Sequence, residues 1–442
     1  MGSSWRQLFS LYLPLAFSDM IMFTTGPLVA ATLTRLSHPE VHLAAFGVAE
    51  SLAILFEAPI FMFLHASTAL SRSWETFKRL FFFMLLWALP LTALLGLLAW
   101  WTPFYHLVFR EILAVPEAVA EAGRPALKAL LLYPGFIAWR RVMQGLLIRK
   151  GRSRALAWGS IGRFLGLLGG LALGVFLRWP GALVGGMALG ISVGVEAVWV
   201  TLAARGYFHP GAFADEKEPY LPDGRPLPPT MRWLWSFYWP LAASASYLFL
   251  SKPLLQGGLA RTADGLAALA IWPAVWTTAL LLANTTRMIQ QLALVTVRDA
   301  RSLKEVGAFA WSLAFGAGAL LGALSFTPLA PFYLGVALGL PPELVSPALF
   351  TLRLLSPLPF LVVAQNWLQA HLVRQGRSQT VQVGSLTNSV VSLVILFSLA
   401  RSFPGPGSAL GALAVLAGFG VEILWLYARS RQAVAVLAEK GA

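Results

Sequence analysis

Arg149-Lys150-Gly151-Arg152-Ser153 returns, 225 residues later, as Arg374-Gln375-Gly376-Arg377-Ser378. Gly194-Val-Glu196 returns with nearly the same spacing as Gly420-Val-Glu422, and other segments repeat likewise, among them Ser10–Ala16 as Ser236–Ala242. The chain is therefore one half-length unit written twice. In a membrane protein, such a duplication is typical of a transporter whose substrate site lies where the two repeats face each other.

The composition indicates an integral membrane protein. The mean hydropathy is +0.70, and 12% of the residues are charged, against about 25% in soluble domains. Each apolar run exceeds the roughly 20 residues that a helix needs to cross a bilayer. We predict an all-α protein with twelve transmembrane helices in two six-helix lobes, at 8–35, 41–70, 77–101, 125–148, 155–177, 181–205, 233–260, 265–297, 305–329, 345–373, 379–400 and 406–428.

The longest polar break divides the chain into two lobes. It lies at 207–232 and holds Asp215-Glu-Lys-Glu218 and several prolines, which oppose both helix and burial. We predict a first lobe at 1–206, a cytoplasmic linker at 207–232 and a second lobe at 233–442. Because each lobe has an even number of helices, the repeats are parallel and related by a pseudo-two-fold axis along the membrane normal.

The distribution of Lys and Arg predicts the orientation. Most of these residues fall in the segments that lie inside if the N-terminus is inside, so both termini are predicted to be cytoplasmic. The formal charge of +14 then faces anionic lipid, and no nucleic-acid partner is needed. The Arg-rich, Lys-poor composition suggests a bacterium. We therefore expect a multi-pass protein of the bacterial inner membrane, and we further expect it to work as a monomer.

Enzyme signatures are lacking in the sequence. Cysteine is absent, which excludes disulfides and cysteine nucleophiles. No spaced metal-ligand cluster, nucleophile elbow or phosphate-binding loop is present. We therefore expect neither an enzyme nor a resident metal or cofactor.

Charged residues inside the predicted helices are the candidate functional residues. A charge at the bilayer centre costs about 2.5–3.5 kcal/mol on insertion scales, so each should be paired or face a watery cavity. Glu196 and Glu422 are equivalent in the two repeats, which favours a structural role such as pairing with Arg. Arg140 and Arg141 diverge by about 100° around their helix, and at least one should pair with Glu50 or Glu57.

Three cations of the second half have few acids near them in the sequence. They are Lys252, Arg287 and Arg353, and the acid available away from the helix ends of that half is Glu422. This excess predicts a pocket for phosphate or carboxylate, for which Arg is well shaped. The pocket would include Lys252, Arg287, Arg353, Asn284, Gln365 and Asn366. The alternative is a set of interhelical hydrogen bonds with snorkelling Arg side chains.

Acids of the first half form a second candidate group. Asp19, Glu50 and Glu57 are candidates for coupling or gating, with H⁺ or Na⁺ as the coupling ion. The alternative is that these carboxylates neutralise Arg140, Arg141 and Arg163.

Motifs of the second half resemble a known family. Two lobes of six helices match the MATE-like multidrug/oligosaccharidyl-lipid/polysaccharide (MOP) transporter superfamily in layout. Ser236-Phe-Tyr-Trp-Pro-Leu-Ala242, Ser251-Lys-Pro253 and Leu352-Arg-Leu-Leu-Ser-Pro-Leu-Pro359 resemble the progressive ankylosis protein family within it. Weaker likeness runs through Ala45–Ala49 and Leu147–Lys150, so the resemblance covers most of the chain.

The resemblance implies an exporter of polyvalent anions such as nucleotide, citrate or other dicarboxylates, and pyrophosphate. The match carries over at Lys252 and Arg353, and at Arg287 with a gap. The chain departs from the family at Thr24 and Gly26, where acids are expected, and lacks the long acidic tail of the animal proteins.

These observations predict a transporter that exports anionic metabolites by alternating access between the lobes. Two other functions remain open. One is a flippase for lipid or lipid-linked oligosaccharide, and the other is an H⁺- or Na⁺-coupled multidrug exporter that uses the acids of the first half. A scaffold or receptor is the alternative outside transport, and the duplicated intramembrane charges disfavour it.

Overall fold

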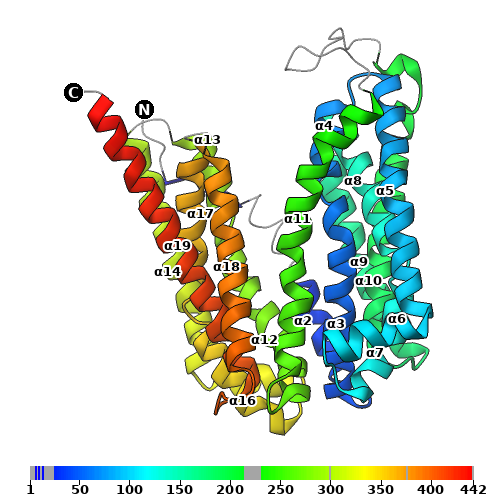
Figure 1. The fold of residues 1–442 in the computed structure, drawn as a ribbon, viewed down its shortest axis with the longest axis vertical. Coiled ribbons are helices and arrows are strands. Elements are labelled where there is room, and N and C mark those ends of the chain that lie inside the picture. Colours follow the sequence, from blue (N-terminus) through cyan, green and yellow to red (C-terminus); the bar gives the residue numbers. More distant parts are fainter. Residues whose placement is uncertain are drawn as a thin grey trace. The chain divides into compact units, whose positions relative to one another are not determined.

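The computed structural model describes residues 5–6, 8–9, 12–13, 24–213, 230–297, 300–374 and 377–440. These residues form helices joined by short turns, with no strand among them (Figure 1). Contacts divide the chain into two compact units. Unit 1 comprises Met1–Ala44 and Leu254–Ala442, and unit 2 comprises Ala45–Pro253.

Unit 2 contains most of the helices of the first repeat and most of α11. They are α3 (Pro39–Glu57), η1 (Ala58–Ile60), α4 (Phe63–Leu70), α5 (Trp74–Trp100), α6 (Thr102–His106), η2 (Leu107–Ile112), α7 (Glu117–Ala129), α8 (Tyr133–Arg149), α9 (Ser153–Phe176), α10 (Gly181–Ala204), η3 (Arg205–Tyr207), η4 (Pro210–Phe213) and α11 (Met231–Ala260).

Unit 1 joins α2 to the rest of the second repeat. Its helices are α2 (Thr25–Leu33), α12 (Gly265–Ala283), η5 (Asn284–Thr286), α13 (Ile289–Thr296), α14 (Ala300–Phe326), α15 (Leu329–Phe332), η6 (Tyr333–Ala337), α16 (Pro342–Leu354), α17 (Leu358–Arg374), α18 (Ser378–Leu399) and α19 (Gly407–Lys440).

Nine helical segments of the described residues are long and apolar enough to cross a membrane. Three of the twelve predicted spans are not among them. The span at 8–35 lies partly outside the described residues, and the span at 125–148 is divided by the break between α7 and α8. The span at 233–260 is the single 30-residue helix α11. The count of twelve therefore remains a prediction.

The repeated tag Arg149–Ser153 is a helix stop. Gly151 has φ +68°, a conformation that glycine adopts without steric cost. The Gly151 amide donates to the carbonyl of Ile148 at 3.0 Å, and the Arg152 amide donates to that of Leu147 at 2.8 Å. This pair of bonds is the Schellman motif. In the second repeat, the Arg377 amide donates to the carbonyl of Leu372 at 2.9 Å, so the described part of that tag ends α17 in the same way.

A second repeated element is a π-helical turn after α6 and after α15. Pro103-Phe104-Tyr105 precedes η2, and Pro331-Phe332-Tyr333 leads into η6. The Tyr105 hydroxyl donates to the carbonyl of Ala120, and the Tyr333 hydroxyl lies 3.0 Å from the Thr278 hydroxyl. Burial raises the pKa of both tyrosine hydroxyls.

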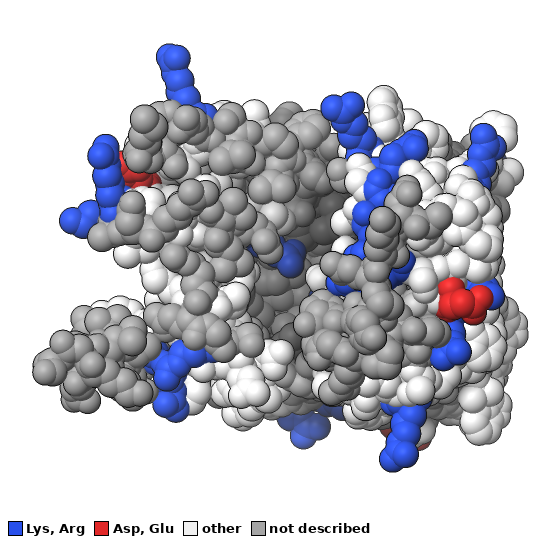
Figure 2. Space-filling view, turned by 90° about the horizontal axis from the view of Figure 1, so that it is seen from above, with Lys and Arg blue, Asp and Glu red and all other residues white. Residues whose placement is uncertain are grey.

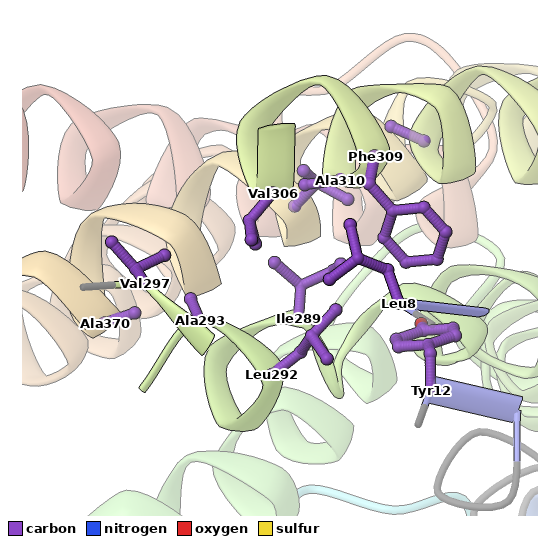
Figure 3. Packing of buried hydrophobic residues seen from close by; sticks show 12 residues of the cluster. Leu8, Tyr12, Ile289, Leu292, Ala293, Val297, Val306, Phe309, Ala310 and Ala370 are labelled. Carbon is purple, nitrogen blue, oxygen red and sulfur yellow. The ribbon is translucent and has the colours of Figure 1, made fainter. Parts of the chain in front are cut away.

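A hydrophobic cluster of unit 1 joins residues near the N-terminus to helices of the second repeat (Figure 3). Leu8 and Tyr12 pack against Ile289 and Leu292 of α13 and Phe309 of α14. The Tyr12 and Phe309 rings meet edge to face, with centroids 5.6 Å apart. Residues of the first repeat therefore help to build the core of a unit made mostly from the second.

In unit 2, conversely, α11 comes from the second repeat and packs on helices of the first repeat. The Tyr238 ring stacks on Phe63 with centroids 4.3 Å apart, and its hydroxyl donates to the carbonyl of Pro59 at 2.6 Å. The compact units thus differ in their bounds from the sequence repeats. The division at 1–206, 207–232 and 233–442 remains a prediction about the repeats, and residues 214–229 of the linker lie outside the described residues.

Candidate functional site

A buried carboxylate organises the charged centre of unit 2. Glu196 of α10 is 2% exposed, and it accepts a hydrogen bond from the guanidinium of Arg140, which is 3% exposed. The Gln144 amide donates to the second carboxylate oxygen at 2.8 Å. The Arg163 guanidinium of α9 lies 3.7 Å from the carboxylate. The predicted pairing with arginine is thus confirmed for Glu196. For Glu422 it is wrong within the described residues, because Gln365, Gln369, Ser385 and Asn388 donate to that carboxylate instead.

Helix packing explains how these side chains meet. Arg140 and Gln144 are one turn apart on α8, so they share a face, and α10 packs against both α8 and α9. Gly159 of α9 lies at the point where this helix comes close to α10. A Cβ at this position would lie 3.2 Å from the Trp199 ring and 3.5 Å from Cγ of Glu196.

Arg141 points to a different neighbour, as its position on α8 predicts. Its guanidinium carbon lies 4.4 Å from the centre of the Phe61 ring, and its buried Nε has no hydrogen-bond partner. The Phe61 ring lies 5.9 Å from that of Phe249, and Lys252 Nζ lies 5.3 Å from the Phe249 ring. The two cation–ring distances, from Arg141 to Phe61 and from Lys252 to Phe249, are within the range of cation–π attraction. Two cations therefore flank one pair of aromatic rings.

The two acids of α3 belong to the same charged group. Lys252 and Arg163 act electrostatically on the Glu50 carboxylate. Glu57 acts on Arg140 and Arg141. We define the unit 2 charge cluster as four cations and three acids: Arg140, Arg141, Arg163, Lys252, Glu50, Glu57 and Glu196.

The cluster therefore contains one more positive charge than negative. Glu196 is already engaged by Arg140 and Arg163. The predicted neutralisation of cations by first-half acids is present in part, since Glu50 and Glu57 lie among those cations. Asp19, the third predicted coupling residue, lies outside the described residues.

The three cations predicted to bind an anion do not fall in one unit. Lys252 belongs to unit 2, whereas Arg287 and Arg353 belong to unit 1. Arg353 Nε donates to the carbonyl of Ser325 at 3.1 Å, and its guanidinium lies 5.7 Å from the Phe326 ring. Its equivalent in the first repeat, Lys128, lies in the same way 5.3 Å from the Trp100 ring. This repetition points to a structural role for Arg353 at the end of α14.

The remaining predicted site residues lie in the middle of unit 1. Arg287 is exposed and follows η5, which contains the buried Asn284 and packs against α17. On α17, Asn366 Nδ2 donates to the carbonyl of Val362 at 2.7 Å, and Gln365 Nε2 donates to Glu422 at 2.6 Å. The structure thus brings Asn284 and Arg287 next to the helix that carries Gln365 and Asn366.

Aromatic residues beside the cations were missed by sequence reasoning. Phe61 and Phe249 carry no signal in an apolar chain that has 29 phenylalanines. Among the described residues, no group of three or more His, Asp or Glu side chains is close enough to hold a metal ion.

Comparisons with known proteins establish the fold. No family matches the chain by sequence, and no curated protein matches it. A MATE family multidrug resistance transporter of the MOP superfamily, solved facing inward, is similar with a TM-score of 0.67 and 13% identity, covering 100% of this chain and 97% of its own. The chain therefore has the fold of MATE transporters, as predicted.

Two further structures share this fold. A MOP superfamily transporter from Pyrococcus furiosus, described as having a binding pocket of reverse polarity, is similar with a TM-score of 0.60 and 12% identity, covering 99% of each chain. The lipid II flippase MurJ is similar with a TM-score of 0.65 and 10% identity, covering 96% of this chain and 87% of its own. The narrower resemblance to the progressive ankylosis family remains a prediction.

Proposed function

We propose that this protein is a membrane transporter that exports anionic metabolites of the nucleotide, citrate or dicarboxylate, and pyrophosphate class by alternating access. The observation that supports this most is the positive excess of the unit 2 charge cluster. Glu196 is engaged by two of the four cations, while Arg141 keeps a buried Nε without a partner.

The physical argument rests on the cost of unbalanced charge. A charge held within a membrane-embedded unit is costly unless it is paired or hydrated. A bound carboxylate or phosphate removes the excess and supplies the acceptor that Arg141 Nε lacks, since guanidinium pairs with both groups through two hydrogen bonds. The Phe61 and Phe249 rings beside Arg141 and Lys252 displace water and so strengthen that attraction.

A multidrug exporter that binds cations at Glu50 and Glu57 is less compatible with this cluster. Lys252 and Arg163 act on Glu50, and Glu57 acts on Arg140 and Arg141. These cations cancel the attraction of the carboxylates for a cationic drug. The reversed pocket polarity described for the Pyrococcus furiosus transporter supports the idea that this fold accepts more than one sign of charge.

A lipid flippase is the second candidate, favoured by the likeness to MurJ. Unit 2 has a cavity of about 490 Å³ on its side, between α5, α8 and α10, lined mainly by apolar residues such as Leu85, Leu89 and Val198. The side chains that line it include no cation. A pyrophosphoryl lipid needs such a cation, so this cavity suits an acyl chain better than a head group.

For the membrane, we propose the bacterial inner membrane with both termini cytoplasmic. Lys and Arg side chains are visible at more places than Asp and Glu among the described residues of the face seen in Figure 2. In unit 2, exposed cations gather at the turns that the sequence places inside, at Lys78, Arg79, Arg152 and Arg205. This pattern agrees with the positive-inside rule.

Efflux from liposomes tests the proposal. The full chain is reconstituted, and efflux of labelled citrate, ATP and pyrophosphate is measured for the wild type and for Lys252→Ala and Arg141→Gln. A hydrogen bond to a charged group contributes about 1.5–3 kcal/mol, so each variant should lower transport about tenfold or more. Lys128→Ala, which removes an exposed cation from a Trp100 contact, is the matched control and should transport normally.

Three results separate the alternatives. Wild-type vesicles that move none of the three anions, or variants that match the wild type, would refute the anion proposal. Scrambling of a labelled lipid would favour the flippase, and uptake of a cationic dye would favour the drug exporter. Arg287→Ala and Arg353→Ala in the same assay test the remaining predicted site residues.

The expectation of a monomer is tested by the mass of the detergent-solubilised protein.

A further inference from the structure

The apolar cavity of unit 2 lies where three helices each place a small residue. Ala88 of α5, Gly135 of α8 and Ala197 of α10 line it, and α8 packs against both α5 and α10. Leu89 and Val198 also line the cavity, and both side chains are more than half exposed. The cavity, of about 490 Å³, therefore opens at the surface of unit 2.

The second repeat fills the equivalent space with aromatic rings. Phe360 stands where the first repeat has Gly135, and Phe315 stands where it has Leu89. The two rings meet edge to face with centroids 5.2 Å apart. Phe360 also packs so closely on α14 that a Cβ at Gly318 would lie 2.4 Å from its ring. A space that has lost such a side chain is destabilising, so an apolar occupant would stabilise the first repeat.

A second cavity of unit 2, of about 440 Å³, adjoins the first at the end of α10. Leu202 lines both cavities. The second is lined besides by Ala203, Arg205, Gly206 and Tyr207, and by Arg152 from the turn before α9. It thus contains two guanidinium groups and no carboxylate. Within the part of the chain that the structure describes, none of the ion pairs involves either arginine.

Backbone structure and aromatic packing hold these cations in place. Arg152 belongs to the repeated tag that ends α8, and Arg205 begins η3 at the end of α10. The next residue after η3, Phe208, stacks on Phe77 of α5 with centroids 6.3 Å apart. Lys150 Nζ, in the tag, donates to the carbonyl of residue 212 at 2.8 Å. The tag and η3 are therefore tied to the same end of unit 2.

The two cavities follow each other along α10 in the order of a membrane lipid. The apolar cavity lies within the candidate membrane spans Trp74–Trp100 and Gly181–Tyr207, and the polar cavity lies at the end of the second span. From Ala197 to Arg205, α10 rises by about 12 Å. The hydrocarbon of one leaflet is about 15 Å thick, half of the bilayer core. A phosphate held at the arginines therefore leaves its acyl chain at the depth of the apolar cavity.

Charge selects the head group. A phosphodiester pairs with guanidinium through two hydrogen bonds, and the Tyr207 hydroxyl is a further donor. A zwitterionic lipid would bring an ammonium group to two arginines that have no acid beside them in the cavity, whereas an anionic lipid brings none. Basic pockets of this kind at a membrane surface suit anionic head groups.

We infer that the two cavities form one binding site for an anionic phospholipid of the adjacent leaflet. Its phosphate lies at Arg152, Arg205 and Tyr207, and one acyl chain lies between α5, α8 and α10. The site belongs to one unit and one leaflet, so the lipid is held there and is not carried across. It shares no residue with the unit 2 charge cluster, and its occupancy does not depend on the proposed transport of anions.

The test measures lipid binding to the purified full chain in neutral detergent. Binding of radiolabelled phosphatidylglycerol is titrated with phosphatidylcholine or inorganic phosphate as competitor. The wild type should bind one phosphatidylglycerol per chain about tenfold or more tightly than phosphatidylcholine. Excess inorganic phosphate should not displace it, because phosphate has no chain for the apolar cavity.

Variants at the two ends of the site are compared with matched controls. Arg152→Gln and Arg205→Gln remove the head-group cations, and each should weaken binding about tenfold. Val198→Trp fills the apolar cavity from an exposed position and should weaken binding as much. Arg154→Gln and Leu165→Trp make the same changes at exposed positions that line neither cavity, and both should bind as the wild type does.

Three results would overturn the inference. Equal binding of the two lipids would mean that the arginines do not select a head group. Equal losses in Arg152→Gln and Arg154→Gln would mean that only the general positive charge of this face attracts the lipid. Displacement by inorganic phosphate would indicate a site for a soluble anion. Because the assay contains no transported anion, a failure of anion efflux would leave this result unchanged, and the two proposals fail separately.

Discussion

Glu196 and Glu422 occupy equivalent positions in two charge environments, and this predicts losses of unequal size for the same substitution. Glu196→Gln leaves Arg140 and Arg163 as buried cations without their carboxylate. Breaking a buried ion pair in this way costs about 3–5 kcal/mol. Glu422→Gln keeps an amide that four neutral donors can partly satisfy, so we expect a loss of about 1–2 kcal/mol.

Thermal unfolding of the detergent-solubilised variants checks this contrast. Glu196→Gln should melt well below the wild type, and Glu422→Gln should melt close to it. Equal melting temperatures for the two variants would show that the guanidinium groups of unit 2 do not distinguish the sites.

At the scale of single residues, the sequence predicts the partners of charged side chains better than the place of these side chains in the fold. It predicted that Arg140 and Arg141 face different neighbours and that Glu196 pairs with arginine, because helix geometry and the cost of charge suffice for both. The same pairing predicted for Glu422 is wrong, since neutral amides replace the arginines there. It grouped Lys252 with Arg353, which belong to different units, and this grouping stays a prediction. The carbonyl partner of Arg353 is Ser325, 28 residues away, and no local pattern reveals a contact of that kind.

At the scale of elements, close helix packing depends on single glycines. A Cβ at Gly145 of α8 would lie 2.8 Å from the carbonyl oxygen of Leu64 in α4 and would overlap Ser67. Backbone atoms cannot move aside cheaply, so Gly145→Ala should cost about 1–3 kcal/mol. Gly169→Ala in α9, where no atom lies within 4 Å, is the matched control and should leave stability unchanged or slightly higher.

The yield of monodisperse protein and the melting temperature check this prediction. A normal melting temperature for Gly145→Ala would mean that α4 and α8 separate without cost. The Ser67 hydroxyl, which donates to the carbonyl of Val142 at 2.7 Å, would then also be dispensable.

Proline positions show what the sequence could and could not say about helix ends. Pro59 lies in a 3₁₀ turn, η1, which separates α3 from α4. Pro134 and Pro359 are equivalent in the two repeats, and each is the second residue of its helix, α8 or α17. Proline is tolerated there because the backbone N–H groups of the first helical turn have no acceptor within the helix, so a missing N–H costs nothing. The turn before α17 contains Pro357, a breaker that the sequence shows, whereas the turn before α8, at Leu130–Leu132, carries none.

At the scale of the whole molecule, the duplication predicted the fold class but not the compact units. The repeat boundaries follow sequence similarity, whereas the units follow packing. α11 therefore packs with the first repeat through Tyr238 and Phe63, and Leu8 and Tyr12 pack with the second. Such an exchange leaves no trace in composition or periodicity, because every helix involved is apolar on most of its surface.

Membrane topology is the prediction that concerns the entire chain, and the absence of cysteine makes it directly measurable. Gly206→Cys lies after α10, at a position where nothing is within 4 Å, and Ser402→Cys lies in the exposed turn before α19. The positive-inside distribution places Gly206 inside and Ser402 outside. A membrane-impermeant maleimide should therefore label Ser402→Cys in intact cells and Gly206→Cys only in inverted vesicles. The opposite pattern would place both termini outside and would reverse the direction of the proposed export. Labelling of both positions from one side would contradict the parallel two-lobe topology on which alternating access depends.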